Sequence, residues 1–394
     1  MKKSLSVSCL LIGSLLAPVA WAVPRVPAQA SEVLERLPMR PGDTAARELA
    51  ALRIDVRQAA EADPHDPLAA TRLAERYFDL AMARGDPRYV GYAEAVLQPF
   101  GEVQSAALWA LRGQLQQYRH GFAPALEDFA NALKIDPQFA SAHAWRGAIY
   151  LVQADYSAAR EECAALKALG RLALRGACMG LLEAYTGHLD AALGYLQQAI
   201  SVSAEPDNLL WLDTRVGEVQ AWHGQAALAE AAYRRALALK LDDGYLLAAW
   251  SDFLLDHQRP AEVVKALAAW EASDTLLLRL ALAETQLDLP KAGAHTQALD
   301  DRFAAAKQRG DTTHRAEEAR FLLRLKGDAA QALQVAVDNY QVQREPRDAR
   351  ILLEAALAAK SPAAAQPVLD WLARSGFEDP RLRTLAATLT KAAP

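Results

Sequence analysis

The sequence predicts an all-α protein in which helical hairpins stack side by side into a solenoid. Hydrophobic residues make up 52% of the 394 residues but aromatic residues only 7%, and much of the apolar fraction is Ala and Leu, the best helix formers. Runs of β-branched and aromatic residues, which are typical of strands, are absent. Gly and Pro fall between the apolar helical stretches, as at Gly121, Pro137, Gly187 and Gly224, where helices are expected to break.

A small residue recurs at one place in successive hairpins. The five positions are Gly113, Gly147, Gly180, Gly217 and Ser251, separated by 34, 33, 37 and 34 residues. The helix after each one carries a matching small-and-bulky pattern: Ala125-x3-Phe129-x2-Ala132, Ala159-x3-Cys163-x2-Leu166, Ala192-x3-Leu196-x2-Ala199, Ala229-x3-Tyr233-x2-Ala236 and Val263-x3-Leu267-x2-Trp270. Small residues let two helices approach, and a bulky residue fills the space beside them. Each hairpin leaves an apolar face that the next one covers, which predicts a stacked array.

This repeating pattern of small and bulky residues resembles that of the tetratricopeptide repeat family. The resemblance is carried by Trp109-x3-Gly113, Ala125-x3-Phe129-x2-Ala132, Pro137, and the 34-residue echo at Gly147 and Tyr150. It implies a right-handed superhelix of helical hairpins that binds a protein or peptide along a concave groove lined by the first helices, without a cofactor. The groove positions that it implies are Gln114, Gln117, Tyr118, Tyr185, Trp211, Glu218, Trp222, Tyr245, Asp252 and Asp256.

Two interpretations stay open for the aromatic residues of the inner helices. Trp and Tyr offer large contact areas at low entropic cost, so Tyr118 and Trp222 suit a recognition surface, but they equally suit packing between hairpins. Core packing is favoured for Trp145, Trp250 and Trp270.

The acidic residues of the predicted groove indicate what it could accept. Some family members clamp a C-terminal carboxylate with Lys and Asn, but the corresponding positions here are Ala110, Gln114, Ala144 and Ala148, so that clamp is absent. Glu218, Asp252 and Asp256 would suit a basic or polar segment instead.

The first 22 residues have the pattern of a cleaved signal peptide. Lys2 and Lys3 precede an apolar stretch from Leu5 to Leu16, and Ala20-Trp21-Ala22 has the small-x-small form of a cleavage site. The apolar stretch is shorter than the roughly 20 residues of a membrane-spanning helix. We therefore expect cleavage after Ala22, a mature chain without a transmembrane segment, and a periplasmic or secreted location.

The remaining chain divides into four predicted parts. Residues 23–42 are a Pro-rich, poorly ordered lead. Residues 43–103 hold helices at 44–62, 67–83 and 87–97, the last two forming a first hairpin. Residues 104–272 form the regular array. Residues 273–394 form divergent hairpins, with helices at 275–287, 294–309, 315–325, 329–340, 348–359 and 363–374, and a capping helix at 380–391.

Cys163 and Cys178 lie at equal distances in sequence from a turn centred on Gly170-Arg171. Antiparallel helices joined there bring the two cysteines to the same level, so an oxidising compartment would allow a disulfide. The alternative is a pair of small buried apolar residues.

Composition and motifs argue against several classes of function. Loss of Lys2 and Lys3 with the leader leaves 41 basic against 48 acidic groups, and the scattered charges argue against a nucleic-acid partner. His120, His188, His223 and His257 fall in successive hairpins roughly 10 Å apart, too far to converge on one metal, so neither a metal site nor a cofactor is expected. No catalytic motif is present.

The expected function is a protein-binding scaffold or adaptor of the bacterial envelope, not an enzyme. An exported helical enzyme, such as a lyase or transglycosylase, is the alternative, and a structural role through self-association is a third. A cleft Glu with a raised pKa would favour the enzyme, and an open groove lined by first-helix aromatics would favour the scaffold.

Overall fold

A computed structural model describes residues 44–101 and 105–392 of the chain. The expected signal peptide and the whole of the Pro-rich lead, residues 23–42, lie outside these residues. All regular secondary structure within them is helical, which confirms the all-α prediction. The helices are α1 (Ala45–Ala62), α2 (Leu68–Arg84), α3 (Arg88–Leu97), η1 (Gln98–Phe100), α4 (Ala106–Tyr118), α5 (Phe122–Ile135), α6 (Ala140–Val152), α7 (Tyr156–Ala168), α8 (Leu172–Tyr185), α9 (Leu189–Ser201), α10 (Pro206–Trp222), α11 (Ala226–Ala238), α12 (Gly244–Asp256), α13 (Pro260–Leu267), α14 (Asp274–Gln286), α15 (Ala292–Gln308), α16 (Arg315–Phe321), η2 (Leu322–Lys326), α17 (Ala329–Val342), α18 (Pro346–Ala358), η3 (Pro362–Ala365), α19 (Gln366–Ser375) and α20 (Pro380–Ala392).

Where the sequence predicts helix bounds, in residues 44–97 and 275–391, the observed ones agree to within about two residues when η2 and η3 are counted with the helices that they adjoin. Helix ends throughout the described chain follow local signals. Ser105 and Asp243 cap α4 and α12 with side chains that accept a backbone N–H. Gly85 and Gly376 end α2 and α19 in the left-handed conformation that glycine adopts without strain. None of the described helices has the length and apolar character needed to cross a membrane.

The recurrent small position is where paired helices touch. A Cβ atom added to Gly113 would lie 2.8 Å from the Phe129 ring, and one added to Gly180 would lie 2.7 Å from the Leu196 side chain. Ser251, at the same place in α12, is fully buried. In the hairpins of Gly113 and Gly180 the bulky residue of the second helix therefore packs directly onto the backbone of the first helix, whereas a Cβ atom added to Gly147 of α6 would lie 3.3 Å from the Cys178 sulfur of α8.

We expect Gly217→Ala to lower the free energy of unfolding by about 1–3 kcal/mol, because its Cβ would lie 2.7 Å from the Tyr233 ring. Gly194→Ala is the matched control: that glycine is also helical but has open space around it, so alanine should stabilise by about 0.5–1 kcal/mol. Urea denaturation measures both. Adding Tyr233→Leu should recover part of the loss, and a Gly217→Ala chain as stable as wild type would contradict direct packing.

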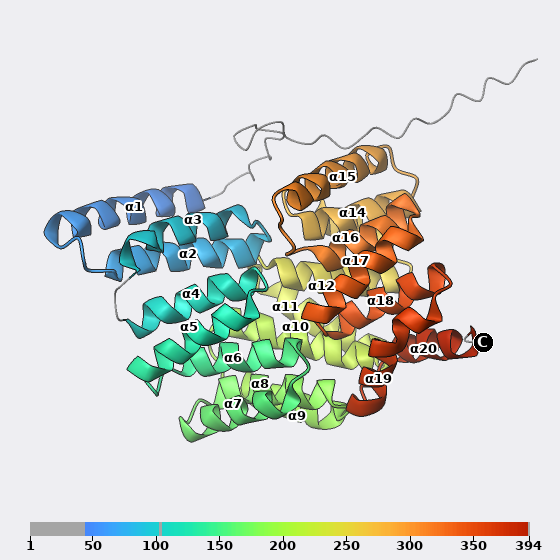
Figure 1. Cartoon of the computed structure of the whole chain (residues 1–394), viewed down its shortest axis with the longest axis horizontal. Coiled ribbons are helices and arrows are strands. Elements are labelled where there is room, and N and C mark those ends of the chain that lie inside the picture. Colours follow the sequence, from blue (N-terminus) through green and yellow to red (C-terminus); the bar gives the residue numbers. More distant parts are fainter. Residues whose placement is uncertain (1–43, 102–104, 393–394) are drawn as a thin grey trace, which may run out of the picture.

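The solenoid folds back on itself, so that its C-terminal hairpins meet its own inner helices. In Figure 1 the helices from α2 to α9 descend along one side of the molecule, and those from α14 to α20 occupy the other. The backbone N–H of Arg344 donates to the carbonyl oxygen of Val152 at 2.8 Å, and the Trp371 indole N–H donates to the Tyr156 hydroxyl at 2.7 Å. Repeated small rotations between hairpins accumulate into this curvature.

The buried core is continuous from α6 to α20. One cluster of apolar side chains runs from Leu151 to Leu389, and two smaller clusters lie among α1 to α6. Cys163 and Cys178 belong to the large cluster and are joined by a disulfide, with Cα atoms 5.6 Å apart. Trp250 and Trp270 are buried in the same cluster, as favoured from the sequence.

Candidate functional site

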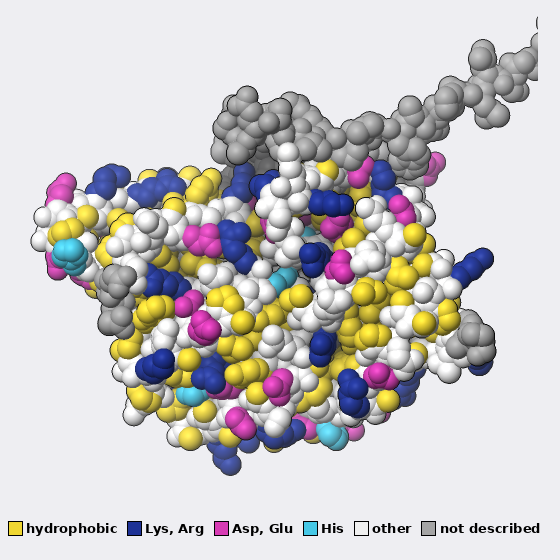
Figure 2. Space-filling view, viewed as in Figure 1, with side chains coloured by type: hydrophobic (Ala, Val, Ile, Leu, Met, Phe, Trp, Pro, Cys, Tyr) yellow, Lys and Arg dark blue, Asp and Glu magenta, His cyan; other side chains and the backbone are white. Residues whose placement is uncertain are grey.

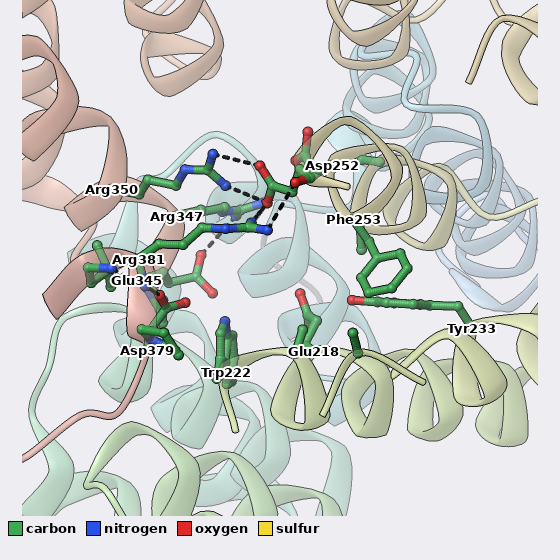
Figure 3. Close-up of a pocket in the computed structure, with 18 of the residues that line it drawn as sticks. Glu218, Trp222, Tyr233, Asp252, Phe253, Glu345, Arg347, Arg350, Asp379 and Arg381 are labelled. Atoms are coloured by element: carbon green, nitrogen blue, oxygen red, sulfur yellow. Dashed lines mark hydrogen bonds and ion pairs between the residues drawn. The ribbon is translucent and has the colours of Figure 1, made fainter. Parts of the chain in front are cut away.

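A cavity of about 310 Å³ lies between the inner face of the array and the C-terminal hairpins. One wall comes from α8, α10, α11 and α12, with Arg279 of α14, and the other from the start of α18 and the start of α20. Figure 3 shows Trp222 and Glu218 on one side of this central cavity and Arg347 on the other.

The inner wall is built by repeat register. Tyr185, Trp222 and Asp256 each follow a small position (Gly180, Gly217 and Ser251) by five residues, so equivalent sites of three hairpins face the same space. Within one helix, Glu218 and Trp222 are four apart, as are Asp252 and Asp256, which places each pair on one face.

The outer wall is built by the first turn of α18. The backbone N–H of Glu345 donates to the Asp348 carboxylate at 3.0 Å, and the Asn339 amide donates to the same carboxylate at 2.8 Å. Burial raises the pKa of Asp348 to about 7, but its side chain is fully buried and fixes the helix start rather than facing the cavity. This cap directs the side chains of Arg347 and Arg350 toward the inner helices.

The acidic residues of the inner wall are already paired with arginines of the same chain. Asp252 accepts from Arg279 and from Arg320, each at 2.6 Å. Burial alone would raise the pKa of Asp252, but the two guanidinium charges bring it well below its ordinary value.

Asp256 lies at the junction between the array and the C-terminal hairpins. It accepts two hydrogen bonds from Arg350 at 2.8 Å each, and it pairs with Arg381. These contacts join α12 to α18 and α20. The basic segment that the acidic groove was expected to accept is therefore supplied by the chain itself.

The Glu218 carboxylate is also paired with side chains of the same chain. Its carboxylate accepts from the Tyr245 hydroxyl at 2.6 Å and from Arg215 at 2.9 Å. The Arg215 guanidinium lies 5.0 Å from the Trp211 ring centroid and 4.2 Å from that of Tyr245. This arrangement locks the carboxylate and the two rings into one rigid group.

Arg347 lines the cavity with a guanidinium group that has unused hydrogen-bond donors. Its Nη2 donates to Glu345 at 2.8 Å, and its other N–H groups have no hydrogen-bond partner within the described residues. The Glu345 charge raises the pKa of Arg347, yet half of the side chain (50%) is still exposed, because it lines the cavity. A guanidinium fork with free donors is suited to carbonyl or carboxylate oxygens.

The structure brings six of the ten predicted groove residues to this cavity: Tyr185, Glu218, Trp222, Tyr245, Asp252 and Asp256. Trp211 does not line the cavity; its ring lies against Arg215, which pairs with the cavity residue Glu218. Gln114, Gln117 and Tyr118 do not line the cavity; they are half-buried on α4, where Tyr118 packs edge-on against Phe78 at 6.4 Å between centroids.

The expectation of an open concave groove is wrong. Tyr185 is only 3% exposed, because Phe377 packs edge-on against it at 6.4 Å and its hydroxyl donates to Glu345 at 3.2 Å. Phe377 also packs on Trp222, with centroids 5.3 Å apart. The C-terminal residues Phe377, Glu345 and Arg350 therefore cover part of the inner face of α8 to α12.

The cavity wall formed by the start of α18 was not predicted from the sequence. Its signal was the segment Glu345-Pro346-Arg347-Asp348, in which a proline at the first helical position and two acidic residues three apart mark a helix start. Arg350 follows Arg347 by three residues and therefore shares its face. Nothing local to this segment shows that it meets α8 and α12.

No protein-family model matches the chain, and no curated protein matches it either. Among solved structures, the chain is similar to the APC/C hetero-tetramer Cut9–Hcn1, with 16% identity and a TM-score of 0.49 over 82% of this chain and 62% of that chain. It is also similar to a tetratricopeptide repeat protein from Parabacteroides merdae ATCC 43184 (16% identity, TM-score 0.43, 61% of this chain and 93% of that chain). A third is the tetratricopeptide repeat domain of P58(IPK) (14% identity, TM-score 0.22, 88% and 98%).

The chain is a tetratricopeptide-like solenoid. This conclusion rests on its own packing, since the small position meets the bulky residue of the following helix in three hairpins, at Gly113–Phe129, Gly180–Leu196 and Gly217–Tyr233. Within the described residues, no group of three or more His, Cys, Asp or Glu side chains is arranged to hold a metal ion.

Proposed function

We propose that this solenoid is an exported protein-binding module of the bacterial envelope, without catalytic activity, which receives a short segment of a partner chain in the central cavity. The observation that carries the proposal is Arg347, which keeps unused donors in a cavity that also presents the Trp222 ring. An aromatic face beside a guanidinium suits a peptide that offers an apolar side chain next to a carbonyl or carboxylate.

The charges of the cavity favour binding over acid–base chemistry. Burial would raise the pKa of Glu345, but the charges of Arg347 and Arg215 bring it below the ordinary value. Asp252 is shifted in the same direction. Carboxylates held ionised in this way are poor proton donors, whereas a lyase or transglycosylase needs one with a raised pKa. The alternative of an exported enzyme is therefore not supported by this cavity.

Two further observations support the choice of compartment and partner. The leader pattern of residues 1–22 and the disulfide between Cys163 and Cys178 both suit an exported chain. On the face that Figure 2 shows, basic and acidic side chains are interspersed without a large patch of one sign, which suits a protein partner better than nucleic acid.

The test is photo-crosslinking in intact cells. A photoreactive residue replaces Ala226, which is exposed and lines the cavity, and the control replaces Leu228, which is exposed on the same helix away from it. We expect one partner chain to be captured at position 226 and not at 228. Arg347→Lys keeps the charge that pairs with Glu345 but loses the planar fork, so it should lower capture several-fold without changing the melting temperature. Equal capture at both positions, or no effect of Arg347→Lys, would refute the proposal.

A further inference from the structure

A second groove, separate from the central cavity, lies where the turn between α6 and α7 meets the C-terminal helices. It has a volume of about 610 Å³. Its walls come from the start of α7 and from α17, α18, η3 and α19, and they include the apolar side chains of Val337, Leu352, Pro367 and Trp371. Figure 2 views the face on which α17 to α19 approach α6, and hydrophobic side chains gather there. We call it the Tyr340 groove.

Tyr340 is a buried phenol without a partner. The residue is 4% exposed, lines the groove, and its hydroxyl makes no hydrogen bond within the described residues. A buried hydroxyl left unsatisfied costs about 1–3 kcal/mol, so its retention requires a reason. An acceptor atom of a ligand seated in the groove would supply the missing bond.

Tyr156 contributes a second available proton. Its hydroxyl oxygen accepts from the Trp371 indole at 2.7 Å, which leaves the phenolic hydrogen free to donate. Burial raises the pKa of Tyr156 to about 12, so the phenol stays protonated at neutral pH. Both tyrosines therefore act as donors toward the same space.

Two arginines stand at the rim. Arg344 and Arg374 are exposed, line the groove, and have no ion pair among the described residues; both bring positive charge to the Tyr340 hydroxyl. The one carboxylate of the lining, Asp370, accepts from Gln366 at 2.7 Å. Two cations against one carboxylate leave a single unmatched positive charge, which fits a monoanion better than a dianionic phosphate.

We propose that the Tyr340 groove binds an organic carboxylate with an apolar body. The carboxylate accepts from Tyr340 and Tyr156 and pairs with Arg344 or Arg374, and the apolar body lies against Trp371. A volume of this size is typical of ligand pockets. Such a group occurs at the end of a peptide chain and in a free aliphatic acid, so both sources share the chemistry that the groove recognises.

The test is calorimetric titration of the full mature chain with four probes. Decanoate and decanol differ only in the charged end group, and an acetylated apolar pentapeptide is used with a free C-terminus and as the C-terminal amide. We expect decanoate or the free-acid peptide to bind with a Kd below about 1 mM, and decanol and the amide to bind at least tenfold more weakly. Decanoate alone would indicate an aliphatic acid, and the free-acid peptide alone would indicate a chain end.

Three variants locate the binding. Tyr340→Phe removes only an unpaired hydroxyl, so it should leave the melting temperature unchanged or higher while weakening binding about fivefold. Arg344→Gln combined with Arg374→Gln should weaken it at least tenfold. Arg57→Gln, an exposed arginine on α1, is the control and should change nothing. If no acidic probe binds, or if the double arginine variant binds as well as wild type, the proposal is wrong.

Discussion

Replacing Asp252 with asparagine is expected to lower the free energy of unfolding by about 3 kcal/mol, measured by urea denaturation. Asp252 receives charged hydrogen bonds from Arg279 and Arg320, and the Arg279 side chain is only 7% exposed. The substitution leaves Arg320 without a counter-charge among the described residues and leaves Arg279 only the more distant Glu317, at 4.0 Å, and a poorly compensated buried charge costs more than the lost pair itself. We place the value at the lower end of the usual range because 28% of the Asp252 side chain is exposed.

The matched control is Asp190→Asn, whose side chain is 92% exposed, and it should change stability by less than about 0.5 kcal/mol. A double-mutant cycle with Arg320→Met isolates the pair, since Asp252 is the one ion-pair partner found for Arg320 among the described residues. The coupling energy should exceed about 1 kcal/mol. Additive effects would show that Asp252 does not hold Arg320 in solution.

We expect Asp252 to make the stability of the fold sensitive to acid. The folded-state pKa of Asp252 lies below its ordinary value, so its contribution to stability is fully present above that ordinary value and is lost as the pH falls toward the folded-state pKa. Denaturation midpoints of wild type should therefore drop on acidification more steeply than those of Asp252→Asn. Parallel pH profiles would contradict this assignment.

The helices and one wall of the central cavity can be predicted from the sequence, because both depend on local rules. Helix ends follow caps and glycines, and the inner-face positions follow the 3.6-residue period and the repeat register, which together assign Trp222 and Asp256 to one surface. The other wall depends on superhelical curvature, which is the sum of many small rotations between hairpins. The bond from Tyr185 to Glu345 spans 160 residues, and no local pattern encodes such a contact.

The C-terminal hairpins cover part of the inner face, and this limits which of its residues are available to bind a partner. The acidic positions Asp252 and Asp256 are satisfied by the chain's own arginines, so a partner cannot use them without displacing those contacts. What is left for recognition is the donor-rich part: Arg347 in the central cavity, and the tyrosines of the Tyr340 groove. We therefore expect both proposed sites to select partners that offer hydrogen-bond acceptors, although the chain as a whole is mildly acidic.

Breaking the disulfide between Cys163 and Cys178 is expected to lower the free energy of unfolding substantially. Cross-linking two residues 15 apart restricts the unfolded chain, and a loop of this length corresponds to about 3 kcal/mol. We expect equilibrium urea unfolding of wild type in the presence of a thiol reductant to show that loss. The double variant Cys163→Ala with Cys178→Ala should have a free energy of unfolding lower than that of oxidised wild type by at least the same amount. The Cys163 side chain is also packed in the core, so its truncation adds to the loss.

The double-alanine variant separates the linkage from packing, since reductant should leave its stability unchanged while lowering that of wild type. Intact-mass measurement of the chain recovered from the cell envelope should show the loss of residues 1–22 together with the loss of two thiol hydrogens. A wild-type chain that reductant does not weaken, or that retains two free thiols after export, would show that the bridge does not form. In either case Cys163 and Cys178 would act only as small buried residues between α7 and α8, and the export proposal would rest on the leader pattern alone.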